Sequence, residues 1–584
     1  MSGARTGLLL ALLAACLYLP GIGRTDLWAP DEPNFAEVSR EMVVDGEWAL
    51  PHDNGEVFTD KPPLFFWLIA LVSLVAGAVS SWTARFPSAV AGIAAVLLTW
   101  RIGRRLLGER AGVAGAAAFA VSWLAFDKGR SAQIDMLLCA LILAALACFL
   151  RVRAGAGRGW ALGLWLAMAL AILAKGPVGL ILPLGTIALF LALSGELRLA
   201  RRLAPVAGPL LLLLVVGAWM AAAQMSGWDE GYSIADALKR HVFLRFAEGM
   251  HHPKPPYYYF QALPRGILPW AGFLPGMIAA GLGGLRRPRR AGPLFLLCWF
   301  GFVFLFFSVS TEKRDLYVLP LYPAAGLLLA LLAEAALPGS KSGGGASGIE
   351  APGLAPEPLS RLWVLVPAWA TALLFAAAGA FALGLSESGA RRLSPQTLAP
   401  LLDEWTGVYG PVRWAVAVLL PGGVAVAVLL WRRRGGAALV AIGAGAGACW
   451  LAVALLVLPA FNPHNSSREF CGRIEAVAGP TLRAGERVGI YRFYRSTFTF
   501  YTPRVRYQTL EGKQETLSFL SAPPPRFLLA LSEDEAAIPL PSGIALDVVE
   551  RGRVGHRKYL LLKSHSGQAP APEAGEQGAG EPGV

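Results

Sequence analysis

The chain has 584 residues, of which 55% are hydrophobic and only 16% are charged. A soluble domain is usually about one quarter charged, and this chain also contains many apolar runs of membrane-spanning length. The composition excludes a soluble protein and predicts a polytopic α-helical membrane protein. The formal net charge of +13 does not indicate a nucleic-acid partner, because the arginines cluster at the ends of apolar runs, as the positive-inside rule predicts.

The first apolar run, residues 7–23, leads into a polar stretch at residues 26–63. This stretch carries the acidic pair Asp31 and Glu32, and it closes with Asp60 and Lys61 before two prolines. Carboxylates gathered at a membrane surface are costly unless they have a function. The stretch is therefore the first candidate for chemistry.

Charge patterning assigns sides to the apolar runs. The arginine cluster at residues 101–110 lies on the cytoplasmic side only if one of the two preceding apolar runs does not cross the membrane. The shorter of these two runs is residues 64–79. We predict juxtamembrane helices at residues 34–44 and 64–79. The first of these is amphipathic, with apolar positions on one face and charged positions on the other: Phe35, Val38 and Met42 against Glu37, Arg40 and Glu41.

If residues 64–79 do not cross the membrane, all later arginine clusters lie on the cytoplasmic side, as the positive-inside rule requires. This topology has about thirteen spans and a cytoplasmic N-terminus. The predicted parts are a catalytic membrane domain (1–335) with periplasmic loops at 24–85 and 224–263, a cytoplasmic linker (336–360), C-terminal transmembrane helices (361–461), a small α/β periplasmic domain (462–565) and a disordered tail (566–584). Within the small domain we predict a helix at 469–478 and strands at 487–494, 526–531, 545–549 and 559–563.

On this topology every unusual ionisable group falls on the outer side. Beyond the first loop, these groups and a neighbouring run of tyrosines are Asp127, Lys128, Arg130, Asp135, Lys175, His251, His252, Lys254, Tyr257, Tyr258, Tyr259, Glu312, Lys313, Arg314 and Asp315. Carboxylates beside several cations at a membrane face suit a lipid-linked anionic substrate. The cations would hold a phosphate, a carboxylate would act as general base, and aromatic side chains would line a prenyl chain.

Each candidate also has a structural interpretation, which the sequence leaves open. Asp31, Glu32 and Asp135 could cap helices, and Lys61 could extend its ammonium from a helix end towards water. Lys175, followed by Gly-Pro, could belong to an ordinary turn. The histidines could be plain loop residues, and the three tyrosines could form an interfacial belt.

Several spaced motifs resemble the family 39 glycosyltransferases, the phospholipid-carrier-dependent bacterial relatives of protein O-mannosyltransferases. They include an aminoarabinose transferase that modifies lipid A. In chain order the motifs are PDEPNFAEVSREMVVDGEWALP, FTDKPPLFFWL, RFPSAVAG, AQIDM, RFAEGMHHPKPPYYY and TEKRDLYVLPLYP. The match covers roughly residues 5–335. The resemblance implies an all-α GT-C fold with about thirteen spans and a polyprenyl-phosphate-sugar donor bound from the periplasmic side.

The resemblance also assigns roles to single residues. Asp31 takes the place of the acidic residue treated as the base, Glu32 follows it in the motif, and Asp135 matches a second acidic residue needed for activity. Lys61 matches the lysine at the donor phosphate, and we add Lys254, Lys313 and Arg314 as further phosphate-binding candidates.

A divalent metal is the one cofactor that the resemblance implies. Asp60 stands where the aminoarabinose transferase has a metal-holding glutamate, and His252 stands at its histidine partner. Aspartate is shorter by one methylene, and family members differ in their need for a metal, so metal dependence stays open. We list Asp60 and His252, together with Tyr257, Tyr258 and Tyr259, as residues that line the substrate.

The sequence thus predicts an inverting sugar transferase of a bacterial inner membrane, whose acceptor is a lipid A-like glycolipid or a protein hydroxyl. Its partners would be the lipid-linked donor, that acceptor and the bilayer. A lipid-linked-substrate transporter or flippase and an inactive scaffold subunit are the alternatives. The first is disfavoured because the ionisable groups gather in outer loops rather than at the bilayer midplane. The second is disfavoured because Asp31, Lys61 and Asp135 are present together.

Overall fold

The computed structural model describes residues 3–226, 254–286, 288, 290–337, 358–384, 407–482, 486–493, 495–523 and 525–566. The chain divides into two compact units. The first comprises Met1–Leu27 and Phe35–Pro463, and the second comprises Trp28–Asn34 and His464–Val584.

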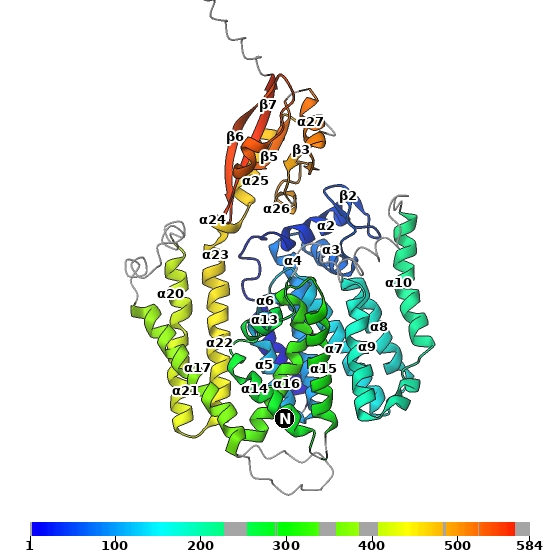
Figure 1. Cartoon of the computed structure of the whole chain (residues 1–584), viewed down its shortest axis with the longest axis vertical. Coiled ribbons are helices and arrows are strands. Elements are labelled where there is room, and N and C mark those ends of the chain that lie inside the picture. Colours follow the sequence, from blue (N-terminus) through cyan, green and yellow to red (C-terminus); the bar gives the residue numbers. More distant parts are fainter. Residues whose placement is uncertain are drawn as a thin grey trace, which may run out of the picture. The chain divides into compact units, whose positions relative to one another are not determined.

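The first unit is a helical bundle, in which the long helices run side by side (Figure 1). Its N-terminal half contains α1 (Gly3–Tyr18), α2 (Asp31–Asp45, whose first turn belongs to the second unit), β1 (His52–Asp53), β2 (Glu56–Val57), α3 (Leu64–Ala76), α4 (Ser81–Leu106), α5 (Glu109–Ala120), α6 (Trp123–Lys128), α7 (Ile134–Arg153), α8 (Arg158–Lys175), α9 (Val178–Ser194), η1 (Leu197–Arg202) and α10 (Ala207–Met225).

The remaining elements of the bundle are α13 (Tyr258–Gly266), η3 (Ala271–Phe273), α14 (Leu274–Gly284), α15 (Ala291–Val309), η4 (Asp315–Leu321), α16 (Tyr322–Ala336), α17 (Pro358–Gly384), α20 (Tyr409–Ala417), α21 (Leu419–Trp431), α22 (Gly435–Ala452), η5 (Val453–Val457), α23 (Leu458–Ala460) and α24 (Asn462–Asn465), the last of which continues into the second unit. Small residues allow close helix crossings, as where α5 meets α16. There a Cβ added at Gly326 would lie 2.5 Å from the Gly115 carbonyl oxygen.

Nine helices within the described residues are long and apolar enough to cross a membrane, and four apolar helices are shorter. The protein is therefore a multi-pass membrane protein, while thirteen spans remains a prediction. One of the shorter helices, α3, has 13 residues. At 1.5 Å per residue it extends about 20 Å, less than the ~30 Å hydrocarbon core. This length agrees with the juxtamembrane helix predicted at residues 64–79.

Two buried arginines hold the chain where α1 ends and the first loop begins. Arg85 of α4 is 4% exposed, and its guanidinium donates to the carbonyls of Ile22, Thr25 and Asp26 and to the Thr25 hydroxyl, at 2.7–2.8 Å. Arg130, 8% exposed, donates to three further carbonyls: Leu17, Tyr18 and Pro20. The carbonyls at the end of a helix have no intrahelical donor, so where water is excluded they need donors from side chains.

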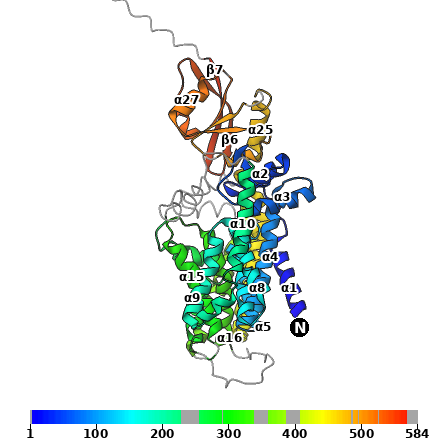
Figure 2. The same ribbon diagram turned by 90° about the vertical axis from the view of Figure 1, so that its right-hand side faces the viewer.

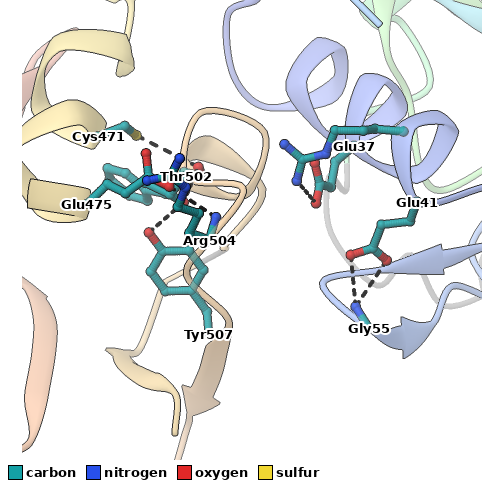
Figure 3. Close-up of polar contacts among 10 residues, drawn as sticks. Glu37, Glu41, Gly55, Cys471, Glu475, Thr502, Arg504 and Tyr507 are labelled. Atoms are coloured by element: carbon teal, nitrogen blue, oxygen red, sulfur yellow. Dashed lines mark hydrogen bonds and ion pairs between the residues drawn. The ribbon is translucent and has the colours of Figure 1, made fainter. Parts of the chain in front are cut away.

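Helix α2 is buried on both faces, which corrects the predicted amphipathic pattern. Phe35, Val38 and Met42 are buried as predicted, but Glu37 is 1% exposed and Glu41 is 4% exposed. The charged face is covered because each carboxylate has a protein partner. Figure 3 shows both contacts: an ion pair of Glu37 with the side chain of Arg40 at 2.6 Å, and the Gly55 amide donating to both carboxylate oxygens of Glu41 at 3.0 and 3.1 Å.

Gly55 lies in the turn of a small hairpin, β1–β2. Both turn residues have positive φ, 59° at Asn54 and 75° at Gly55, as a two-residue type I′ turn requires. An Asn-Gly pair between short strands is a strong sequence signal for this turn, and the sequence analysis missed it. The hairpin gives Glu41 its partner, so it accounts for the burial of the carboxylate.

The second unit contains a five-stranded sheet of order β4-β3-β5-β7-β6. The strands are β3 (Val488–Tyr491), β4 (Tyr507–Leu510), β5 (Phe527–Leu531), β6 (Ile544–Val554) and β7 (Arg557–Ser566), and the other elements are α25 (Arg468–Ala478), α26 (Ser496–Thr499), α27 (Lys513–Ser521) and η6 (Ser532–Ala537). Strands β4, β3 and β5 are parallel, and β7 and β6 add antiparallel. Helices α25 and α27 pack on opposite faces (Figure 2).

The predicted small α/β domain is confirmed, and α25, β3, β5, β6 and β7 lie where a helix and four strands were predicted. The sequence analysis missed β4 and α27. Strand β4 has only four residues with a mixed burial pattern, and α27 begins from Gly512 with a weak apolar stripe. Both owe their structure to packing on the sheet rather than to a clear local periodicity.

We expect Arg85→Lys to destabilise the protein. A lysine keeps the charge but replaces the planar fork with a single ammonium, so buried carbonyls around residues 22–26 lose their donors at a cost of about 2–5 kcal/mol. The apparent unfolding temperature in detergent should fall. Arg104→Lys is the control on the same helix, because Arg104 pairs with Glu109 at a half-exposed site. Equal unfolding temperatures for the two variants would contradict this role of Arg85.

The Glu37 carboxyl predicts a pH dependence of stability. Burial, only partly offset by Arg40, raises the pKa of Glu37 from 4.5 to about 8. Because the pKa of Glu37 is higher in the folded than in the unfolded protein, the carboxyl contributes fully to the free energy of unfolding below the unfolded-state pKa. This contribution is lost as the pH rises through about 8. Glu37→Gln mimics the protonated form, so its unfolding temperature should decline less than the wild type between about pH 5 and pH 9. Glu47→Gln, at an exposed position, should follow the wild-type curve.

Candidate active site

A buried ion pair joins the start of α7 to the end of α8. Asp135 lies in the first turn of α7, and Lys175 is the last residue of α8. The Lys175 ammonium donates to the Asp135 carboxylate, and the two side chains are 16% and 6% exposed. The same ammonium lies 4.7 Å from the ring centroid of Tyr317 in η4. A charge pair with so little water contact is costly to maintain, so it indicates a functional role more than a stabilising one.

The sequence analysis named Asp135 as a candidate and left Lys175 open as a possible turn residue. The structure brings the two together because α7 and α8 are antiparallel neighbours. The available signal was a lone lysine that ends an apolar run at the same outer face as Asp135. A lysine at the end of an apolar run more often extends into the membrane interface, and for that reason the sequence alone did not pair these residues.

The segment between α15 and η4 presents a second group of charges. Lys313 is 2% exposed, and its ammonium donates to the carbonyl of Ser310 and, at 3.0 Å, to that of Lys254. The Lys254 amide in turn donates to the Thr311 carbonyl at 3.2 Å. Burial lowers the pKa of Lys313. Lys313 thus fastens the chain at Lys254 to this segment, and its charge reinforces the positive potential there.

These residues line a pocket of about 450 Å³ in the first unit. The lining residues are Trp123, Leu124, Asp127, Lys128, Lys254, Tyr258, Lys313, Arg314, Asp315 and Leu316. Four cations face two carboxylates, so the lining is formally positive. Lys128 pairs with Asp127 at 2.8 Å, and Asp315 pairs with Arg265 at 3.3 Å. Three of the predicted phosphate-binding candidates, Lys254, Lys313 and Arg314, therefore meet at one pocket.

The three consecutive tyrosines lie in different surroundings. Only Tyr258 lines the pocket, where its hydroxyl donates to Asp315, and burial together with this bond raises its pKa to about 12. Tyr259 is fully buried and donates to the Arg314 carbonyl at 3.2 Å. Tyr257 is 61% exposed. The alternation follows from the start of α13 at this point, because successive residues of a helix point about 100° apart.

The first-loop candidates lie at the starts of two helices. Asp31 and Glu32 form the first turn of α2, and Glu32 accepts a hydrogen bond from the Trp28 amide at 3.3 Å. Asp60 and Lys61 precede α3, and the Lys61 ammonium donates to the Asp60 carbonyl at 3.1 Å. The Trp28 amide precedes α2, so the Glu32 contact braces the chain before the helix and does not cap the helix's own first amides.

His251 and His252 lie outside the described residues, so the predicted pairing of His252 with Asp60 is not tested here. Within the described part of the chain, no three His, Cys, Asp or Glu side chains are grouped in a way that could hold a metal ion. Asp60 is exposed, and its carbonyl is held by its neighbour Lys61.

Comparison with known proteins gives relatives for part of the chain. Residues 60–220 match the family described as dolichyl-phosphate-mannose-protein mannosyltransferase. The undecaprenyl phosphate-alpha-4-amino-4-deoxy-L-arabinose arabinosyl transferase of Edwardsiella ictaluri is 31% identical over 327 residues, which are 55% of this chain and 58% of the relative. A second such transferase, from Sodalis glossinidius, is 32% identical over 340 residues, 56% of this chain and 59% of the relative. The chain thus matches slightly under three-fifths of these relatives' length.

Solved structures match nearly the whole chain. The crystal structure of ArnT from Cupriavidus metallidurans bound to undecaprenyl phosphate superposes with a TM-score of 0.74 at 21% identity, covering 96% of this chain and 98% of that one. The archaeal oligosaccharyltransferase AglB from Archaeoglobus fulgidus superposes with a TM-score of 0.52 at 12% identity, covering 91% and 69%. The apolar helices and the bacterial relatives indicate a multi-pass protein of a bacterial inner membrane. The comparisons confirm the resemblance to phospholipid-carrier-dependent glycosyltransferases, and the chain has the GT-C fold of ArnT.

Proposed function

We propose that the chain is an integral-membrane glycosyltransferase that moves a sugar from a polyprenyl-phosphate carrier to an envelope acceptor. The observation that carries the proposal is the meeting of Lys254, Lys313 and Arg314 at one pocket of about 450 Å³. These cations are phosphate-binding candidates from two sequence motifs that lie apart in the chain. Pockets of this size usually accommodate a small ligand or head group, and the positive lining suits a phosphate.

In the proposed reaction an acceptor hydroxyl attacks the anomeric carbon of the donor sugar. The new carbon–oxygen bond forms as the bond from that carbon to the phosphate oxygen breaks, with inversion at carbon. Asp31 takes the hydroxyl proton, and the polyprenyl phosphate leaves with the electron pair. Lys61, Lys254 and Arg314 stabilise the negative charge that grows on the leaving phosphate, and such stabilisation is often the largest catalytic contribution.

The buried pair of Asp135 and Lys175 is assigned to the sugar. Asp135 would accept hydrogen bonds from sugar hydroxyls, and Lys175 would orient this carboxylate through their ion pair. Glu32 would keep the first turn of α2 in place through its bond to the Trp28 amide. Tyr258 would line the donor site, while the contribution of Lys313 is to fix Lys254 and to add positive potential.

The relatives suggest the substrates. Their names specify an undecaprenyl phosphate-alpha-4-amino-4-deoxy-L-arabinose donor, and the matched solved structure contains undecaprenyl phosphate. We propose the same class of donor here, with a lipid A-like glycolipid as acceptor and a protein hydroxyl as the alternative. Because the arginine clusters alternate between the predicted loops, the N-terminus would be cytoplasmic and the C-terminal domain periplasmic.

We expect Asp31→Asn to abolish most of the transfer. The amide has nearly the same shape but cannot accept the proton, and loss of a general base typically costs about 10²- to 10⁴-fold in rate. Initial rates would be measured in nanodiscs with undecaprenyl phosphate-linked 4-amino-4-deoxy-L-arabinose and lipid A. Binding of undecaprenyl phosphate should persist in the variant.

Asp45→Asn is the matched control, because Asp45 is an exposed carboxylate at the other end of α2. Normal transfer by Asp31→Asn would show that Asp31 is not the base. A wild-type chain that binds this donor and moves it across the bilayer without transferring the sugar would instead support the transporter.

A double-mutant cycle on Asp135 and Lys175 tests the assignment of the ion pair. Each single change, Asp135→Asn or Lys175→Met, leaves one buried charge uncompensated and should destabilise the protein by about 3–5 kcal/mol. The double variant should regain much of the stability but little of the transfer, because the carboxylate that contacts the sugar is absent. Unfolding temperature and initial rate would be measured on all four proteins.

Breaking the pair of Arg153 and Glu196 provides the control for the cycle. This pair lies at the opposite end of α7, is 29% and 33% exposed, and should contribute no more than about 1 kcal/mol. If the double variant of Asp135 and Lys175 recovered the full transfer rate, the pair would have only a structural role.

A further inference from the structure

The residues around Asp31 belong to the unit that contains the C-terminal α/β domain. Trp28–Asn34 and His464–Val584 form one compact unit, although more than 400 residues separate them in the chain. A hydrogen bond joins them directly: the Ser496 hydroxyl donates to the carbonyl of Pro30 at 3.2 Å. Pro30 immediately precedes Asp31, so this bond fixes the peptide unit from which the first turn of α2 begins.

Ser496 is well placed to act as a fixed point because the short helix α26 is anchored in the core of the domain. Ser496 is fully buried. Two residues later, the ring of Phe498 packs against three aromatic rings at centroid distances of 5.1–6.0 Å, those of Phe470, Phe493 and Tyr559. A helix of four residues is not stable by itself, so these contacts determine its position.

The backbone of α26 is also hydrogen-bonded to its surroundings. The Ser467 hydroxyl donates to the Thr497 carbonyl, and the Phe498 carbonyl accepts from the Cys471 thiol at 3.7 Å and the Thr502 hydroxyl at 2.9 Å. Thr502 also contacts the Tyr507 hydroxyl at 2.8 Å (Figure 3). Helix α25 and the residues beside β4 therefore hold both sides of α26, which leaves Ser496 little freedom to move.

The Ser496 bond reaches the segment at a residue that cannot itself donate a backbone hydrogen bond. Pro30 has no amide hydrogen to donate, and an amide in the first turn of a helix has no intrahelical acceptor. Within this unit, the Trp28 amide bonds to Glu32 and the Pro30 carbonyl bonds to Ser496, so one bond closes the segment on itself and the other ties it to the domain.

We propose that Ser496 is a positioning residue for Asp31, through which the C-terminal α/β domain sets the orientation of the first turn of α2. The proposal rests on the proposed function, which gives Asp31 its role as proton acceptor. Ser496 would then act on the proton acceptor from within the same compact unit. Substrate binding by cations elsewhere in the chain does not depend on this contact, so the proposal predicts a loss in kcat with little change in KM for the donor.

The test uses the full-length protein in nanodiscs and compares Ser496→Ala with Ser564→Ala. Ser564 is 1% exposed in strand β7 of the same domain, and its hydroxyl accepts a hydrogen bond at 2.8 Å from the amide of Arg526, the residue before β5. Both variants lose one buried hydrogen bond. Transfer would be assayed with undecaprenyl phosphate-linked 4-amino-4-deoxy-L-arabinose and lipid A, and hydrogen exchange would be followed in the peptide that contains the Trp28 amide.

Ser496→Ala should lower kcat about 3- to 10-fold, the effect of one lost hydrogen bond, with KM for the donor within about twofold of wild type. It should also speed exchange at Trp28. Ser496→Thr, which keeps the hydroxyl, should restore most of kcat. If the alanine variant does not fold, Ser496→Cys keeps the volume with a weaker donor and should give an intermediate kcat.

Unchanged exchange at Trp28, or a kcat for Ser496→Ala equal to that of Ser564→Ala, would overturn the proposal. A wild-type protein that transfers no sugar would overturn the proposed function and with it the catalytic part of this inference. The exchange measurement would still decide whether Ser496 holds the segment, so the two failures are distinguishable.

Discussion

The structure depends on satisfying backbone carbonyls where the first helix ends and the first loop begins. A helix leaves its last four carbonyls without partners, and at a membrane face water is not a dependable substitute. Here Arg85 and Arg130 provide the donors from helix α4 and from the residues before α7. Asn462, at the end of the last apolar helix, adds bonds to the Asp26 amide and the Arg24 carbonyl. The polar stretch therefore starts from a backbone that is held from three directions.

This arrangement explains why buried charge is tolerated in the first unit. Arginine is weakly hydrated and always protonated, and its planar fork can satisfy several carbonyls at once. Lys313 plays a similar part with its single ammonium, bridging the carbonyls of Ser310 and Lys254. Such cations hold irregular backbone and raise the local positive potential at the same time. The bundle thus obtains structural support and positive potential from the same residues.

The fold and the identity of the candidate residues were largely predictable from the sequence, because apolar length, arginine position and spaced motifs are local signals. Partnerships were not predictable. The sequence left Lys175 open as a turn residue and gave Lys313 as a phosphate-binding candidate. Only the packing of α7 against α8 and of Lys254 against the segment at 310–314 shows the groups that the two ammoniums contact. Glu37 and Glu41 show the same limit. Their spacing predicted a solvated face, but an Arg40 side chain and a hairpin amide allow both carboxylates to be buried.

The contact between Ser496 and Pro30 spans 466 residues and could not be read from either local sequence. Its physical sense comes from the chemistry proposed for Asp31. A general base needs to be held to within a fraction of an ångström, and the Pro30 carbonyl, one residue before Asp31, accepts a hydrogen bond from Ser496. A rigid α/β domain supplies such a bond from a buried position. On this argument the sheet of the second unit is a support for one short segment, and the stability of α26 becomes a determinant of catalysis.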